Sequence, residues 1–222
     1  MHPRALWLAS VCAAAMAGSA QAAPVTWYAG VEGGWGGIMD QDARFMGTIP
    51  ATVTRVVTTQ ADAKFDSGWA LLATLGMDIG GGWRMEGELG YRSNDFKLAI
   101  PTTLGTATKG GSFDEISAMG NWLLDLPLNG SGSLKLSLGF GVGVDYAELK
   151  TDFGFDATEW SVAYQGIAGL ALELDSQTDV TLTFRHFRIN EPEFDDTTIV
   201  PQQVHFEELG KNSLTIGLRR AL

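Results

Sequence analysis

Cysteine, basic charge and long apolar runs are all scarce in this sequence. The single cysteine lies at position 12, and beyond residue 23 no apolar run reaches about 18 residues. A transmembrane helix needs about 20 such residues, so none is expected in that part of the chain. Acidic residues outnumber basic ones by 26 to 15. This balance argues against nucleic acid as a partner, because nucleic-acid binding rewards basic patches.

The N-terminal segment predicts a secretory signal peptide. Arg4 supplies the positive region, residues 6–17 form a short apolar core, and Ala20-Gln21-Ala22 is a small-residue cleavage site. Cleavage there would remove the only cysteine, which leaves no thiol for a metal or redox site. We therefore expect residues 1–22 to be a signal peptide and residues 23–222 to form one exported domain.

The rest of the chain shows alternation of apolar and polar residues with a period of two. In the clearest block the even positions from Leu134 to Tyr146 are apolar, and the odd positions between them are small or polar. Alternation of this kind predicts strands that are apolar on one face only. The eight expected strands are Trp27–Gly36, Ser67–Asp78, Trp83–Ser93, Asp114–Asp125, Ser133–Tyr146, Trp160–Leu174, Val180–Arg188 and Asn212–Leu222.

The connections between these strands alternate in length. Short turns are expected at Ile79–Gly82, Leu126–Gly132 and Asp175–Asp179, and long loops at Gly37–Asp66, Asn94–Phe113, Ala147–Glu159 and Ile189–Lys211. This asymmetry is typical of barrels with short periplasmic turns and long extracellular loops. An open sheet edge cannot be satisfied in hydrocarbon, so the sheet must close. We predict an all-β fold, an eight-stranded antiparallel up-and-down transmembrane β-barrel.

Tryptophan and tyrosine mark the expected borders of the lipid-facing band. Trp27 and Trp35 are eight residues apart on one strand, as are Trp83 and Tyr91 on another. Eight residues of a strand tilted by about 40° span about 20 Å along the membrane normal, close to the height of that band. A soluble core would instead favour tryptophans in mid-strand. The expected aromatic girdles consist of Trp27, Trp35, Trp69, Trp83, Tyr91, Trp122, Tyr146 and Trp160.

Several of these segments resemble a known family. The runs Gly76–Gly80 and Trp83–Arg92, Met119-x-Asn121 and Tyr164–Gly169 are similar to the small outer-membrane β-barrel proteins, the OmpA-like and opacity-protein-like group often called the porin family. The resemblance covers the mature chain. It implies the bacterial outer membrane as location, membrane lipid and lipopolysaccharide as surroundings, and the barrel-assembly machinery as a partner. Its motifs are specific for the fold and weak for an activity.

Charged side chains collect on the face that would line the barrel. An eight-stranded barrel is just wide enough inside for side chains to fill, and buried charges there must pair. We therefore expect a polar plug, with Arg185 as the central cation paired with Glu88, Glu32 or both. The expected lumen residues are Glu32, Arg84, Glu86, Glu88, Arg92, Lys135, Asp145, Glu173, Arg185 and Arg219.

Catalytic sites find little support. Lipid A deacylases among such barrels use a His and a Ser on a lipid-facing strand; His186 has that parity, but Arg188 stands where the Ser is needed. Asp195 and Asp196 are adjacent, which does not itself create the catalytic pair of a protease. With His205 as the one other histidine beyond the signal peptide, no histidine metal site is expected.

The sequence thus predicts a structural outer-membrane barrel without catalytic residues, cofactor or metal site. The acidic segment Asn190–Asp196 would at most share divalent cations with lipopolysaccharide phosphates, since it lacks the ordered spacing of a calcium loop. The extracellular loops would bind a partner outside the cell. The alternative that the pattern leaves open is a narrow porin-like channel for small or apolar solutes.

Overall fold

The structure of the protein is a computed structural model. It describes residues 25–38, 41–48, 56–102, 105–152, 156–190, 193–196, 202–205 and 208–222. The expected signal peptide lies outside this range. Regular structure within the range consists of strands, and no helix there is long and apolar enough to cross a membrane.

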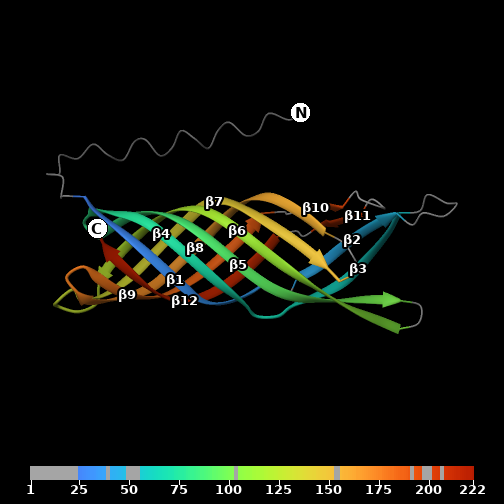
Figure 1. The fold of residues 1–222 in the computed structure, drawn as a ribbon, viewed down its shortest axis with the longest axis horizontal. Helices are drawn as coiled ribbons and strands as arrows, with labels where there is room; N and C mark the ends of the chain where they lie inside the picture. The colour runs from blue at the N-terminus through green and yellow to red at the C-terminus, as the bar shows by residue number, and fades with distance from the viewer. Residues whose placement is uncertain are drawn as a thin grey trace, which may run out of the picture.

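Eight antiparallel strands form a closed barrel (Figure 1). The strands are β1 (Thr26–Ile38), β4 (Gly68–Gly80), β5 (Trp83–Thr102), β6 (Gly105–Pro127), β7 (Leu134–Thr151), β8 (Asp156–Asp175), β9 (Thr178–Asn190) and β12 (Glu208–Ala221). Around the barrel the order is β5, β4, β1, β12, β9, β8, β7 and β6, and β6 pairs again with β5. The prediction of a closed eight-stranded barrel is therefore confirmed, with each strand in its expected place.

The register of the strands fixes their tilt. Paired residues can be followed around the barrel from Tyr28 through the other seven strands to Lys211, which pairs with Ile38, ten residues further along β1. A stagger of this size in eight strands corresponds to a tilt of about 40° and leaves an interior that side chains fill. Residues far apart in sequence therefore reach the same height inside the barrel.

One end of the barrel, here called the turn end, carries the short connections and the C-terminus. Between β4 and β5 the glycines at 80, 81 and 82 all have positive φ, which other residues rarely adopt. Asp78 Oδ1 accepts a hydrogen bond of 2.8 Å from the Gly80 amide. At the β8–β9 turn, Asp175 Oδ1 accepts a similar bond of 2.8 Å from the Gln177 amide. These two carboxylates accept hydrogen bonds from amides of the turns and so stabilise the short connections.

The opposite end, the loop end, contains more strand than expected. Two predicted loops hold the strands β2 (Gln41–Thr48), β3 (Val56–Phe65), β10 (Glu193–Asp196) and β11 (Gln202–His205). These pair in the order β10, β11, β2 and β3 and join the barrel at β5, as Figure 1 shows. In addition, β5 and β6 stay paired as far as Thr102 and Gly105. These segments were predicted as long loops, and the structure shows that they also contain strands. The run of β-branched residues at the start of β3 could have indicated this.

The outer wall of the barrel is apolar, as the alternation predicts. Leu89, Phe140 and Val142 are each at least 60% exposed there. The tryptophans lie on this face with exposures from 37% to 74%, and Trp35 pairs across strands with Trp69. Other aromatic rings on this face contact each other across strands. The ring centroids of Trp69 and Tyr91 on β4–β5, and of Tyr146 and Trp160 on β7–β8, lie about 5 Å apart.

Candidate functional site in the barrel lumen

Inward-pointing polar side chains form three layers between the turn end and the loop end. In the layer at the turn end, Arg84 is 4% exposed and donates to both carboxylate oxygens of Asp125, from Nε at 2.8 Å and from NH2 at 3.1 Å. Arg84 also donates to the Tyr28 hydroxyl at 2.7 Å and forms an ion pair with Glu86. Ser137 donates to Asp125 at 2.6 Å. The strands β1, β5, β6 and β7 are thus linked across the lumen.

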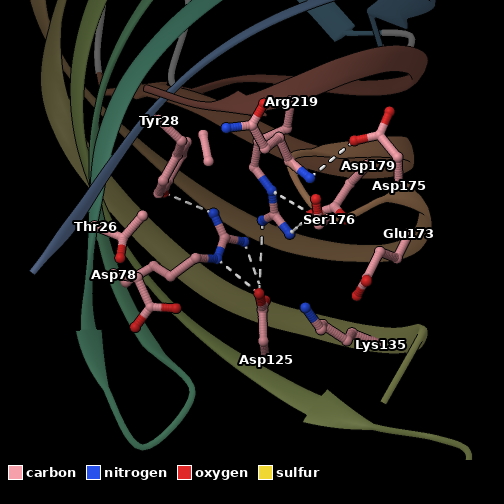
Figure 2. A pocket seen from close by; sticks show the side chains of 13 residues that line it. Thr26, Tyr28, Asp78, Asp125, Lys135, Glu173, Asp175, Ser176, Asp179 and Arg219 are labelled. Atoms are coloured by element: carbon pink, nitrogen blue, oxygen red, sulfur yellow. Dashed lines mark hydrogen bonds and ion pairs between the residues drawn. The ribbon is translucent and has the colours of Figure 1, made fainter. Parts of the chain in front are cut away.

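A cavity of about 240 Å³ opens below this layer at the turn end. Figure 2 shows the Arg219 side chain at this cavity, in contact with both Asp179 and Asp125. Arg219 Nε donates to Asp179 at 3.0 Å, and its NH1 lies 3.5 Å from Asp125. Lys135 and Glu173 also line the cavity, so they belong to its rim and not to the buried part of the lumen.

The middle layer is centred on Arg185, which is 2% exposed. Its NH1 lies 2.6 Å from Glu32 Oε2 and its Nε lies 3.2 Å from Glu88 Oε2. NH1 also donates to Thr215 Oγ1 at 2.9 Å. One cation of β9 therefore joins two carboxylates, from β1 and from β5 on the opposite side of the barrel, and both were expected as its partners.

Neutral side chains complete the middle layer, and sequence reasoning missed them. Glu88 accepts hydrogen bonds from Asn121 at 3.1 Å and from Gln165 at 3.2 Å. Glu32 accepts from Thr215 at 2.6 Å, besides two longer bonds from threonines of β9. The remaining cavity beside this layer measures about 30 Å³, room for about two water molecules. Only their inward-facing positions in the alternating pattern could have indicated these residues, because they carry no charge.

The layer nearest the loop end combines a buried ion pair with polar atoms that have no hydrogen-bond partner among the described residues. Lys211 and Glu115 form an ion pair while both are at least 96% buried. Arg92 donates to Ser117 at 2.7 Å and lies 3.6 Å from Glu88, which connects this layer to the middle one. The Lys211–Glu115 pair was not predicted, because Lys211 was assigned to a loop and β12 begins three residues earlier.

Several buried polar atoms in this layer have no hydrogen-bond partner among the described residues. They include both carboxylate oxygens of Asp145, which is fully buried, and the Nε of Arg92. Buried groups of this kind are normally satisfied by ordered water. The layer nearest the loop end is therefore the part of the lumen best suited to hold water.

An apolar cluster lies above the three polar layers and fills the barrel at the loop end. Its members point inward like the charged residues below them, and each is at most 6% exposed. Two of its rings contact cations of the neighbouring polar layer. Lys211 Nζ lies 4.2 Å from the ring centroid of Phe113, and Arg92 Cζ lies 4.2 Å from that of Phe187. The larger members of the cluster are Ile38, Phe96, Phe113, Leu149, Phe187, Ile189 and Leu209.

A tilted, closed barrel with an apolar outer wall and a charged interior is the architecture of outer-membrane proteins. A family model described as "Outer membrane protein beta-barrel domain" matches residues 5–218. The chain belongs to this family. It is an outer-membrane barrel, with its turn end in the periplasm and its loop end outside the cell.

Solved structures of other outer-membrane barrels share this fold. Neisserial surface protein A is 13% identical, with a TM-score of 0.52 over 88% of this chain and 97% of that chain. The outer membrane protein OprG from Pseudomonas aeruginosa is 13% identical, with a TM-score of 0.53 over 86% of this chain and 95% of that chain. At these identities the likeness shows the fold alone. No curated protein sequence matches this outer-membrane barrel.

Among the residues with a possible role in catalysis or metal binding, the side chains of His186 and Arg188 are described, and they lie outside the lumen. His186 is on the outer wall and is hydrogen-bonded to Arg188 and Asn212. The structure describes no side chain between Glu191 and Asp196, so Asp195 and Asp196 lie outside the described part of the chain in this respect. Within the described residues, no group of three or more His, Cys, Asp or Glu side chains is placed to hold a metal ion.

Proposed function

We propose that this protein is a structural, non-enzymatic barrel whose lumen is plugged and whose extracellular end binds partners. The observation that carries the proposal is Arg185, which joins Glu32 and Glu88 across the middle of the lumen. A bridge of this kind occupies the space that a solute would need. It also stiffens the barrel, because strands β1, β5 and β9 are tied through one buried side chain.

The layers on either side support the same proposal. The middle of the lumen retains only about 30 Å³ of free volume, and the apolar cluster covers the extracellular end. A hydrated ion would have to break several charge-assisted hydrogen bonds and then pass side chains that offer it no polar contact. Both steps raise the free energy of passage.

The extracellular extension supports the second half of the proposal. Strands β2, β3, β10 and β11 continue the sheet beyond the membrane and enlarge the surface that faces outward. Beside them a cavity of about 480 Å³ is lined by charged side chains of both signs, among them Asp66, Lys97 and Lys150. Asp66 accepts a hydrogen bond of 2.8 Å from Lys97 and raises the pKa of that lysine. A hollow of mixed charge favours a polar partner.

A narrow channel is the second candidate, and two observations favour it. The layer nearest the extracellular end contains buried polar atoms suited to water, and the periplasmic cavity of about 240 Å³ reaches up to Arg84. A path would need to join these two regions through the middle layer. A channel therefore requires Arg185 to separate from Glu32 and Glu88, whereas a plugged barrel requires these ion pairs to stay intact.

A liposome-swelling assay distinguishes the two candidates. We expect vesicles that contain the refolded mature chain to swell in isotonic arabinose or glycine no faster than vesicles without protein, because the lumen is filled. A large porin in the same vesicles serves as the positive control. Swelling that rises with the amount of folded protein would favour the channel. An unchanged lipid A mass spectrum in cells that produce the protein would support a role without deacylation.

A further inference from the structure

The cavity of about 480 Å³ at the extracellular end lies beyond the outer aromatic girdle. Asp95, which lines it, follows Tyr91 of that girdle by four residues on β5. Four residues of a strand tilted by about 40° rise about 10 Å along the membrane normal. The cavity is therefore outside the hydrocarbon, where the outer leaflet of this membrane carries the sugars of lipopolysaccharide.

The first row of side chains along this cavity offers both acceptors and donors of hydrogen bonds. Ser112 of β6 pairs with Asp95 of β5 on one side and with Lys150 of β7 on the other. The three residues stand side by side at the strand spacing of about 4.8 Å, in the order carboxylate, hydroxyl, ammonium. Among the described residues, neither the Asp95 carboxylate nor the Ser112 hydroxyl has a hydrogen-bond partner. Both groups are therefore available to a ligand.

The second row has the opposite order of charge. Gly110 pairs with Lys97, and its amide donates a hydrogen bond of 3.2 Å to Asp152. The order across the strands is therefore ammonium, gap, carboxylate, because the glycine has no side chain. A Cβ at Gly110 would lie 2.6 Å from Asp152 Oδ2, so the gap depends on the glycine. A ligand with only one sign of charge would meet repulsion in one half of each row.

A phosphate or sulfate group is disfavoured in this cavity. Lys97 Nζ lies 2.8 Å from Asp66 Oδ2, and these side chains form an ion pair. Lys150 Nζ lies 2.7 Å from Glu148 Oε1. These hydrogen bonds raise the pKa of both lysines, which keeps them charged. The lining still holds three carboxylates against two ammonium groups, a net negative charge. An apolar ligand is disfavoured as well, since Phe96 at the border of the cavity is 3% exposed.

We propose that this cavity binds uncharged sugars of neighbouring lipopolysaccharide, an inference that rests on the proposed role of the extracellular end in partner binding. Each sugar hydroxyl can donate to a carboxylate and accept from an ammonium group, so a sugar satisfies both halves of a row. The opposite charge order of the two rows fixes the direction in which the sugar lies. The volume of about 480 Å³ is within the range of about 300–1,000 Å³ that small-ligand sites occupy.

Isothermal titration calorimetry of the refolded mature chain in phosphatidylcholine nanodiscs tests the site, because these discs contain no sugar. The probes are the core oligosaccharide released from lipopolysaccharide by mild acid and the same oligosaccharide after dephosphorylation. We expect the dephosphorylated form to bind at least as tightly as the phosphorylated form. Asp95→Asn should weaken the binding of either form about tenfold, as the loss of a charge-assisted hydrogen bond predicts.

Glu173→Gln is the matched control, because Glu173 is an exposed carboxylate at the periplasmic end of β8. It should bind the oligosaccharides as the wild type does. No binding of either form, clearly tighter binding of the phosphorylated form, or wild-type binding by a folded Asp95→Asn protein would overturn the proposal. A trilysine peptide that binds more tightly than the sugars would also overturn it and would indicate a basic protein partner instead. Liposome swelling by the wild type would contradict the closed lumen and leave this site unaffected, so the two failures are distinguishable.

Discussion

Replacing Arg185 with alanine should lower the free energy of unfolding by about 3–5 kcal/mol. The substitution leaves Glu32 and Glu88 facing each other in the lumen without the cation that joins them at 2.6 Å and 3.2 Å. Glu88 is 2% exposed, so water cannot easily replace the guanidinium. Urea unfolding of the protein refolded into lipid vesicles, followed by tryptophan fluorescence, measures the change.

The loss should come from the unpaired carboxylates and not from the missing volume. A triple variant with Arg185→Met, Glu32→Gln and Glu88→Gln removes all three charges and should recover most of the stability, because a neutral replacement of a buried ion network is often tolerated. A single alanine variant that unfolds like the wild type and also leaves conductance unchanged would contradict the plug. A hydrated, open lumen would then be the better description.

Arginine at Leu138 should destabilise the barrel by about 2–4 kcal/mol, since it places a charge on the lipid face near the midplane. Leu138 is 43% exposed on the outer wall of β7, and its neighbours on that face are apolar. The same vesicle unfolding assay applies. An effect close to zero would show that this face is not in contact with lipid.

Leu174→Arg is the matched control for depth. Leu174 is 60% exposed on the outer wall at the periplasmic end of β8, where an arginine should cost about 0–1 kcal/mol. Alternation alone suggests Gly139→Ser as a mild lumen-side control, and the structure contradicts this. A Cβ at Gly139 would lie 2.5 Å from the Trp122 carbonyl oxygen and 2.8 Å from Leu123 Cγ, so even a small side chain forces the wall apart.

The strands and their faces could be predicted because lipid imposes a strict rule on each one. A single strand must be apolar on alternate residues, and that pattern is local in sequence. Arg185 could be paired with Glu32 and Glu88 for a related reason, since their distances from the periplasmic strand ends give similar heights. The barrel and the ion pairs at the centre of its lumen could therefore be predicted from the sequence.

The remaining contacts depend on the stagger of the whole barrel. Lys211 meets Glu115 from 96 residues away, and no local pattern encodes that distance. Asn121 and Gln165 bind Glu88 but are neutral, so they did not stand out from other polar residues. The strands above the membrane were missed because lipid enforces alternation only on the segments that cross it.

Single-channel recording in planar bilayers tests most directly whether the lumen is closed. Wild-type protein should insert without producing stable conductance steps, because the Arg185 bridge and the apolar cluster fill the barrel. Arg185→Ala should produce steps if water enters the widened middle layer, and the triple neutral variant should produce fewer. Stable, ohmic conductance from the wild-type barrel would contradict the account and establish a channel instead.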